Sequence, residues 1–155
     1  MALFKNKYRI ESTGLPGYDY FGEIVDSKML LNEIGKFALH CWNGLPNHYE
    51  NIILDEFVIM PNHVHGIIII TDLTTKKQKR HGLSESIRAF KSFSSRRINQ
   101  LRKTPSQIWQ SSFYNHVIRD ENELNRIREY ITDNPLRWEL DNKNPKTFKH
   151  CKGTS

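Results

Sequence analysis

The sequence predicts an α+β fold in which an antiparallel sheet carries helices on one face. Three observations lead to this prediction: apolar residues alternate between helical spacing and short Ile- and Val-rich runs, the elements follow in the order β-α-β-β-α-β-α, and the chain has 155 residues. A chain of this length usually forms one domain, and 37% hydrophobic with 26% charged residues suits one compact core. We therefore expect residues 1–155 to form a single domain.

The first third of the chain predicts one strand and one helix. Residues 7–11 are typical of a strand, and the Gly- and Pro-containing residues 12–17 indicate a turn after it. Apolar residues recur with helical spacing over residues 29–41, which predicts an amphipathic helix. The Gly-Leu-Pro sequence at residues 44–46 is expected to end this helix.

Two strands follow, and the second is expected at the centre of the sheet. Residues 52–60 and 64–71 are rich in Ile and Val and are separated by Pro61 and Asn62. The second segment is apolar throughout its middle, as in a strand that is buried on both faces. Residues 72–82 then break the pattern with a basic loop.

The last part of the chain predicts a helix, a strand and a final helix. Residues 84–101 have helical spacing, and residues 107–118 are a strand candidate that is rich in aromatic side chains. Asp120 is expected to cap the last helix with Glu123 as its capping-box partner, and Pro135 to end it. This element order fits the split βαβ sandwich of ferredoxin-like folds, with an additional C-terminal helix.

Charge and cysteine content narrow the class of protein. Lys and Arg total 23 against 17 Asp and Glu, a net charge of +6, which favours a polyanionic partner. Cys41 and Cys151 form neither a metal-binding pair nor a disulfide framework, so we expect a reducing cytoplasm. The start resembles no signal peptide, and the longest purely apolar run, residues 67–70, is far shorter than the ~20 residues that span a bilayer.

His63 and His65 are the first candidates for chemistry. Residues two apart on a strand project from the same face, so both imidazoles point the same way. Two neutral imidazoles on one face can bind a divalent metal when a carboxylate or an amide completes the shell. The spacing alone fits equally well a pair of structural histidines at a strand end.

Tyr130 and Asn134 are four residues apart on the last helix and therefore share a face. A phenolate oxygen attacks phosphorus well when a metal polarises the phosphate, and an amide oxygen is a hard ligand suited to Mg²⁺ or Mn²⁺. Taken singly, a helical tyrosine is more often a packing residue, and an asparagine before proline is more often a residue that ends a helix.

Three segments of the chain resemble motifs of the single-tyrosine transposases, in the same order. Residues 57–68 resemble their HUH motif (His, hydrophobic, His). Residues 109–120 resemble the segment that leads into their catalytic helix, and residues 127–135 resemble that helix with its Tyr-x-x-x-Asn signature. The likeness extends over about residues 18–138, is greatest to the REP-associated tyrosine transposases, and leaves residues 139–155 as a polar basic tail.

This resemblance implies an HUH-type DNA transposase that depends on a divalent metal, Mg²⁺ or Mn²⁺. It implies that His63 and His65 bind the metal with Asn134 as a third ligand, and that Tyr130 is the nucleophile. The reaction it implies is cleavage and rejoining of single-stranded DNA at hairpin-containing sites through a 5′-phosphotyrosine, in the bacterial cytoplasm at the nucleoid. The group includes monomers and homodimers. His116 lies in a recurrent segment, where it would support the site or contact DNA.

Basic side chains outside these motifs are candidates for contact with DNA phosphates. Such contacts give affinity with a steep salt dependence but little sequence information. A basic helix flank is equally typical of a solvated surface. The candidates are Lys76, Lys77, Lys79, Arg80, Arg88, Lys91, Arg96, Arg97 and Arg119.

Two other functions compete with the transposase. One is a domesticated derivative that binds hairpin DNA without cutting it, and the other is a replication initiator or relaxase with related HUH chemistry. The joint presence of both histidines, Tyr130 and Asn134 argues against a pure binding protein. The short length, the single tyrosine on the last helix and the Asn-Pro ending favour the transposase over an initiator.

Overall fold

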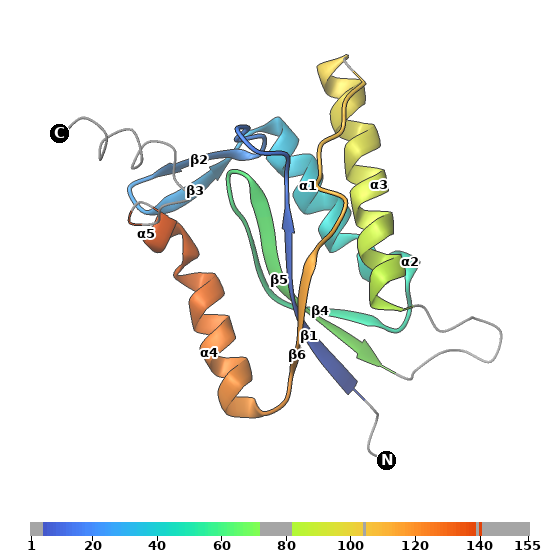
Figure 1. Ribbon diagram of the computed structural model, residues 1–155, viewed down its shortest axis with the longest axis vertical. Helices are drawn as coiled ribbons and strands as arrows, with labels where there is room; N and C mark the ends of the chain where they lie inside the picture. Colours follow the sequence, from blue (N-terminus) through green and yellow to red (C-terminus); the bar gives the residue numbers. More distant parts are fainter. Residues whose placement is uncertain (1–4, 72–81, 104, 139, 141–155) are drawn as a thin grey trace.

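The computed structural model describes residues 5–71, 82–103, 105–138 and 140, and its main feature is a four-stranded antiparallel sheet (Figure 1). The strands are β1 (Lys5–Thr13), β4 (Ile52–Ile59), β5 (His63–Thr71) and β6 (Tyr114–Ile118). They lie in the order β4-β5-β1-β6, and each pairs antiparallel with its neighbour. This order is the predicted split βαβ sandwich of ferredoxin-like type.

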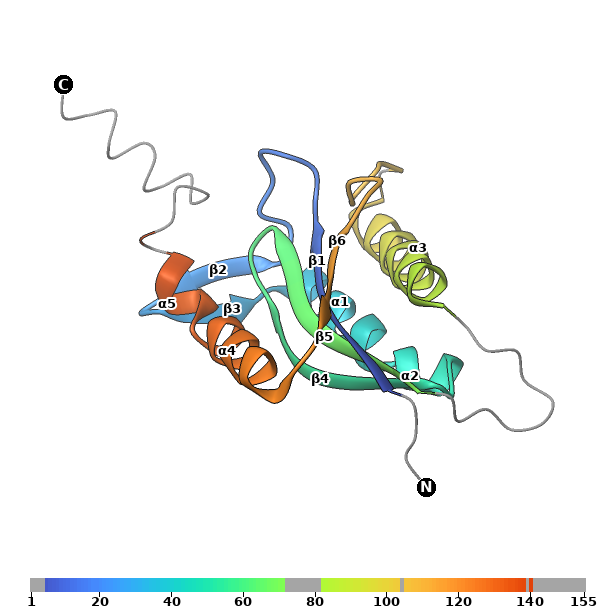
Figure 2. The same cartoon turned by 60° about the horizontal axis from the view of Figure 1, so that its bottom comes forward.

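Helices cover both faces of this sheet (Figure 2). α1 (Glu33–Asn43), the short α2 (Leu45–His48) and α3 (Leu83–Arg102) pack on one face. α4 (Glu121–Thr132) packs on the opposite face and is followed by α5 (Asn134–Trp138). The predicted fold class is confirmed, with the C-terminal helix on its own side of the sheet. Within the described residues, no helix combines the length and the apolar character needed to cross a membrane.

β5 is the strand that separates two hydrophobic cores. All 9 of its residues are buried, and successive side chains point to opposite faces. Val64 and Ile68 belong to the core under α1 and α3, whereas Ile67 belongs to the core under α4. His63 and His65 alternate in phase with Ile67, so both histidines face the α4 side. The buried members of the α4 core are Ile67, Ile118, Leu124, Ile127 and Ile131.

Gly66 is the point of β5 at which α1 packs closely on the sheet. A Cβ added there would lie 2.8 Å from Cβ of Phe57 and 2.8 Å from Cζ2 of Trp42. Trp42 of α1, which is fully buried, therefore packs directly onto the strand behind the histidines. The absent side chain at this position lets the helix approach the sheet closely.

The predicted helix over residues 29–41 is wrong in its first turn. The structure has a hairpin there, made of β2 (Gly22–Val25) and β3 (Lys28–Leu31). Its turn residues Asp26 and Ser27 have φ values of 50° and 61°, which suit the twist of hairpin strands. Asp-Ser is a weaker hairpin signal than Asn-Gly, and the apolar side chains of β3 also fit the helical period of α1, which explains the error.

The predicted strand over residues 107–118 is wrong in its first part, since only Tyr114–Ile118 forms β6. Trp109 makes one isolated bridge and is 3% exposed. Its ring centroid lies 5.0 Å from that of Phe21 and 5.3 Å from that of Phe90. An aromatic-rich segment can fill a core without joining the sheet, so composition alone did not separate the two cases.

Replacing Gly66 by alanine should destabilise the fold, because the added methyl group has no room between Phe57 and Trp42. We expect the free energy of unfolding to fall by about 1–3 kcal/mol in a urea titration. Gly82→Ala is the matched control, since nothing lies within 4 Å of a Cβ added at Gly82. The control should lose less than about 1 kcal/mol. Equal losses in the two variants would contradict the close approach of Trp42 to β5.

Candidate active site

Three of the four residues predicted to carry the chemistry meet at the imidazole of His65. Its ring lies edge-on to the ring of Tyr130, with 5.4 Å between centroids and 69° between planes. The side-chain amide of Asn134 lies 3.0 Å from Nδ1 of the same imidazole. His65 is 1% exposed, Asn134 is 8% exposed and Tyr130 is half-buried. His63 follows on the same face of β5 and is 5% exposed.

The start of α4 is fixed by hydrogen bonds around Glu123. The Asp120 side chain accepts the Glu123 N–H at 2.8 Å, which confirms the predicted N-cap. The Glu123 carboxylate accepts the backbone N–H of Arg119 at 2.9 Å and pairs with His116. The Arg119 N–H, and then His116, hold the pKa of Glu123 below its usual range. The structure thus places His116 at the helix that carries the tyrosine.

An ion pair holds the middle of α4 against β4. The Arg128 guanidinium donates to both oxygens of Asp55, through Nε at 2.8 Å and through an Nη at 2.6 Å. This bidentate contact is the main reason why the pKa of Asp55 lies below its ordinary value. Together with the apolar core under α4, it docks the helix onto the sheet of its own chain. Tyr130 therefore meets a histidine of the same chain.

Arg9 of β1 belongs to the site, although no motif marks it in the sequence. It lies opposite Ile67 in the β1–β5 register and so shares the face of the histidines. Its Nε donates to Nε2 of His65 at 2.9 Å, and its guanidinium lies 5.0 Å from the centroid of the Tyr130 ring. The Arg137 guanidinium lies 5.1 Å from the same centroid. Two positive charges thus flank Tyr130.

Hydrogen bonds determine the tautomers of the two histidines. Oδ1 of Asn62 lies 2.8 Å from Nδ1 of His63, and because this oxygen only accepts, His63 carries its proton on Nδ1. Arginine only donates, so Nε2 of His65 accepts from Arg9 and the proton of His65 is also on Nδ1. The Asn134 amide nitrogen lies 3.0 Å from Nδ1, and turning this amide over brings its oxygen to the same place, where it accepts the Nδ1 proton. The His65 imidazole is therefore neutral, with its lone pair on Nε2.

The donor set around these histidines fits a divalent metal only with help from an amide. Within the described residues, no three His, Cys, Asp or Glu side chains are grouped as a metal site. His63 and His65 supply two nitrogens, and the Asn134 amide next to His65 can supply a hard oxygen. A hollow of about 330 Å³, lined in part by Glu11, Asn62 and His63, opens beside this donor set.

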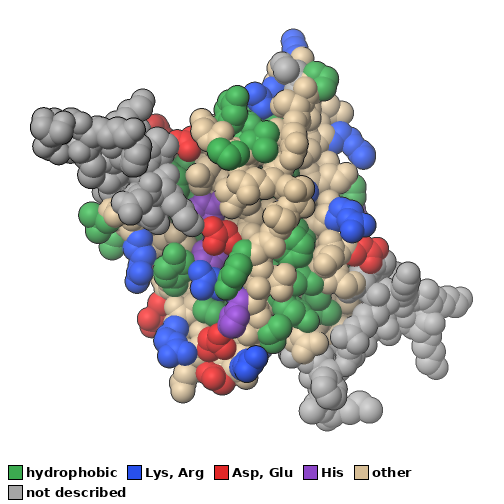
Figure 3. Space-filling view, in the orientation of Figure 1, with side chains coloured by type: hydrophobic (Ala, Val, Ile, Leu, Met, Phe, Trp, Pro, Cys, Tyr) green, Lys and Arg blue, Asp and Glu red, His purple; other side chains and the backbone are tan. Residues whose placement is uncertain are grey.

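Histidine side chains reach the surface near the middle of the face seen in Figure 3, among acidic, basic and hydrophobic side chains. Glu11 adds a carboxylate on this side of the sheet, since it lies opposite His65 in the β1–β5 register. The sequence held no signal for Glu11, because its place depends on strand pairing.

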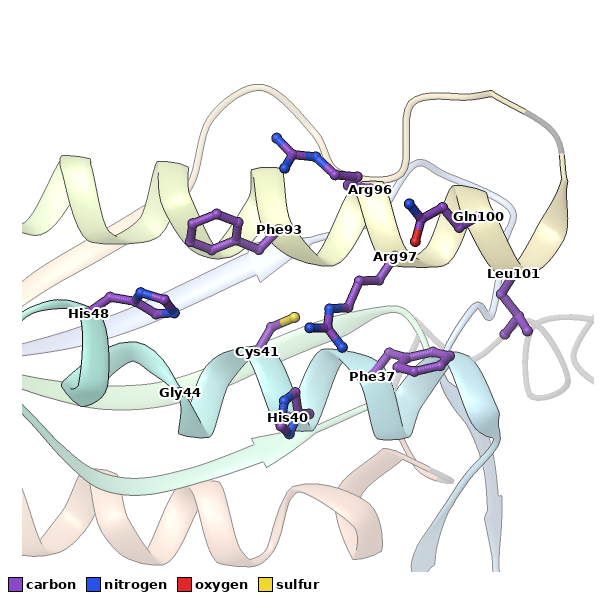
Figure 4. Close-up of a pocket in the computed structure, with 10 residues that line it drawn as sticks. All are labelled: Phe37, His40, Cys41, Gly44, His48, Phe93, Arg96, Arg97, Gln100 and Leu101. Carbon is purple, nitrogen blue, oxygen red and sulfur yellow. The ribbon is translucent and has the colours of Figure 1, made fainter.

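The predicted DNA-contact residues that the structure describes are spread over several elements. The basic loop, residues 76–80, lies outside the described residues. Arg96 and Arg97 line a cavity of about 670 Å³ between α1 and α3, on the opposite face of the sheet (Figure 4). Arg88 is exposed on α3, and Arg119 is exposed just before α4.

Lys91 has a structural contact that the sequence could not show. Its Nζ donates to the backbone oxygens of Gln110 at 2.7 Å and Ser112 at 2.9 Å. Burial lowers the pKa of this ammonium group. Lys91 therefore fixes the irregular segment that leads into β6.

Comparisons with known proteins identify a matching family model and a related sequence. A family model described as "Transposase IS200 like" matches residues 27–134. An uncharacterized protein of Haemophilus influenzae is 36% identical over 135 residues, which cover 78% of this chain and 75% of the relative.

Two solved structures share the fold. A REP-associated tyrosine transposase bound to a REP hairpin superposes with a TM-score of 0.60 at 16% identity, over 88% of this chain and 71% of that one. A candidate transposase from Deinococcus radiodurans superposes with a TM-score of 0.51 at 18% identity, over 85% of this chain and 92% of that one.

Asp55→Asn should loosen the docking of α4 in a manner that depends on pH. Because the folded state lowers the pKa of Asp55, its stabilising effect is complete above about pH 4 and is lost as the pH falls through the folded-state value. We expect a loss of about 1 kcal/mol at pH 7 in urea titrations, and a difference from wild type that vanishes in acid. Glu129→Gln, at an exposed position of the same helix, should be near neutral at both pH values. A pH-independent loss at Asp55 would count against the ion pair.

Proposed function

This chain belongs to the IS200-like transposase family, and from that premise we propose that it cleaves and rejoins single-stranded DNA with Tyr130 as the nucleophile. The observation that carries the proposal is the contact of Tyr130 and Asn134 with the buried His65. A tyrosine that merely packed on the sheet would not need a buried polar cluster beside it, since such a cluster is costly to bury.

The reaction is a transesterification at phosphorus. Tyr130 gives up its phenolic proton to water, and its oxygen attacks the scissile phosphate. The bond from phosphorus to the 3′ oxygen breaks, and the leaving oxygen takes up a proton from water, which gives a free 3′-hydroxyl and a 5′-phosphotyrosine. The bond energy is retained in the phosphotyrosine, so the 3′-hydroxyl of another strand can reverse the step and complete a strand transfer.

The charged side chains of this chain favour that step. The guanidinium groups of Arg9 and Arg137 lie at 5.0 and 5.1 Å from the Tyr130 ring, where they offset the negative charge of the phosphate and the attacking oxygen. His63, His65 and Asn134 would hold a divalent metal, Mg²⁺ or Mn²⁺, which supplies Lewis-acid polarisation of the scissile phosphate when bound. Asn134, which lies against Nδ1 of His65, orients the imidazole for this purpose.

One chain contains the whole set of residues. α4 is docked onto its own sheet by Arg128 and Asp55, and so Tyr130 reaches His65 without a second subunit. We infer that a monomer is competent for cleavage, whereas strand transfer between two ends can still involve a homodimer. The solved relative binds a REP hairpin, and we extend hairpin DNA to this chain as its substrate class, in the bacterial cytoplasm.

The tyrosine is tested by the covalent adduct. Labelled single-stranded hairpin oligonucleotides, taken from the DNA that flanks the gene, are incubated with protein and run on a denaturing gel. Wild type should form a protein–DNA adduct, and Tyr130→Phe should form none, because it lacks the attacking oxygen. Tyr114→Phe is the matched control: this tyrosine is 52% exposed and also lies near Arg9, at 5.7 Å, and its loss should leave the adduct.

DNA binding without an adduct in wild type, with any metal, would favour the hairpin-binding protein over the enzyme. An adduct that persists in Tyr130→Phe would assign the nucleophile to another residue.

The metal is tested by removing one ligand. His63→Ala should slow adduct formation by at least about 100-fold with Mg²⁺ or Mn²⁺, and a chelator should abolish it in wild type. His48→Ala is the control, since His48 stacks on Phe93 at 5.3 Å, away from the site, and should react at the wild-type rate. The single-turnover rates of adduct formation by wild type, His63→Ala and His48→Ala are compared on a denaturing gel. Equal rates with and without chelator would refute the metal.

A further inference from the structure

We propose that Arg9 and the divalent metal compete for His65, so that the metal binds only when the Arg9 guanidinium leaves the imidazole. The inference rests on the proposed metal site at His63, His65 and Asn134. It concerns the state of this site before the metal and the DNA arrive. Arg9 is then a positioning residue, which fixes the His65 imidazole by a hydrogen bond while no metal is bound.

The contact that carries the inference joins a half-buried arginine to a buried histidine. Nε of Arg9 donates to Nε2 of His65 at 2.9 Å, and His65 is 1% exposed. A hydrogen bond from a charged donor is stronger in such surroundings than at an exposed position. The β1–β5 register fixes its geometry, because Arg9 lies opposite Ile67 on the strand next to the histidines.

The chemistry of imidazole makes the two contacts exclusive. A neutral imidazole has one nitrogen with a lone pair and one N–H group, and a metal needs the lone pair. If the metal binds Nε2, it takes the atom that Arg9 occupies. If it binds Nδ1, the proton moves to Nε2, and two N–H donors then face each other. In either case the hydrogen bond from Arg9 is lost.

The displaced guanidinium has a place within the site. It already lies 5.0 Å from the ring centroid of Tyr130 and 5.7 Å from that of Tyr114, on the same face of the sheet. A phosphate bound beside Tyr130 would attract this charge away from His65 and thereby favour the metal. Substrate and metal should therefore bind with positive coupling, each raising the affinity for the other.

The test measures Mn²⁺ affinity of the full chain by isothermal titration calorimetry, without DNA. Arg9→Met keeps the length of the side chain and removes both the donor and the charge, and it should tighten Mn²⁺ binding about tenfold. Lys7→Met is the matched control: Lys7 lies two residues earlier on β1, pairs with Glu121 at 3.3 Å, and loses the same charge. The control should change the affinity by less than about threefold, because its charge is screened by solvent. Unchanged or weaker binding by Arg9→Met would overturn the proposal.

A second measurement needs no metal. Nitrogen-15 NMR of labelled histidines, with His65→Gln to assign the signal, should show His65 with its proton on Nδ1 and an accepting Nε2 in wild type. This accepting signal should shift in Arg9→Met and stay in place in Lys7→Met. A proton on Nε2 of His65 in wild type would refute the inference directly.

The two levels of the proposal fail in different ways. Mn²⁺ binding that is lost in His63→Ala but not tightened in Arg9→Met would leave the metal site intact and refute the competition. Absence of Mn²⁺ binding from wild type and Arg9→Met alike would refute the metal site, and the competition with it. The adduct of Tyr130 is measured separately from both.

Discussion

The imidazole of His65 is buried at the point where β5, β1, α4 and α5 meet, and each of these elements supplies one of its neighbours. A buried polar ring must have its nitrogens hydrogen-bonded, or it costs more stability than the fold gains there. Arg9 satisfies one nitrogen at 2.9 Å and Asn134 lies 3.0 Å from the other. The two nitrogens of this one ring therefore connect β1, which carries Arg9, with the start of α5, which carries Asn134. Displacing Arg9 or Asn134 would remove one of these two contacts.

The position of Tyr130 follows from how α4 is held. The buried stripe of Leu124, Ile127 and Ile131 fixes which side of the helix faces the sheet. Tyr130 lies at the edge of this stripe, half-buried, so its ring reaches His65 while part of the side chain stays exposed. Polar contacts at Glu123 and Arg128 set the helix along its axis. Apolar packing thus stabilises the docking of α4 on the sheet, and the charged contacts fix the position of α4 along its axis.

The sequence predicted the parts of the site that depend on local periods. His63 and His65 share a face because the strand period is 2, and Tyr130 and Asn134 share one because the helical period is 3.6; the structure brings these faces together. Arg9 could not be predicted, because its role depends on the pairing of β1 with β5, residues far apart in the chain. The hairpin of β2 and β3 was missed for a different reason. Its apolar residues fit both the strand period of 2 and the helical period of 3.6, and only tertiary packing determines which structure forms.

The proposed metal site has to remain folded when no metal is bound. A buried imidazole nitrogen left unpaired costs roughly 1–3 kcal/mol. The Asn62 contact and the Arg9 donor remove part of that cost and set the tautomers that a metal requires. The partner that stabilises the empty site must also be one that can be displaced. An arginine meets this condition better than a carboxylate, since a metal repels the guanidinium and a phosphate attracts it, so the two ligands of the reaction release the same residue.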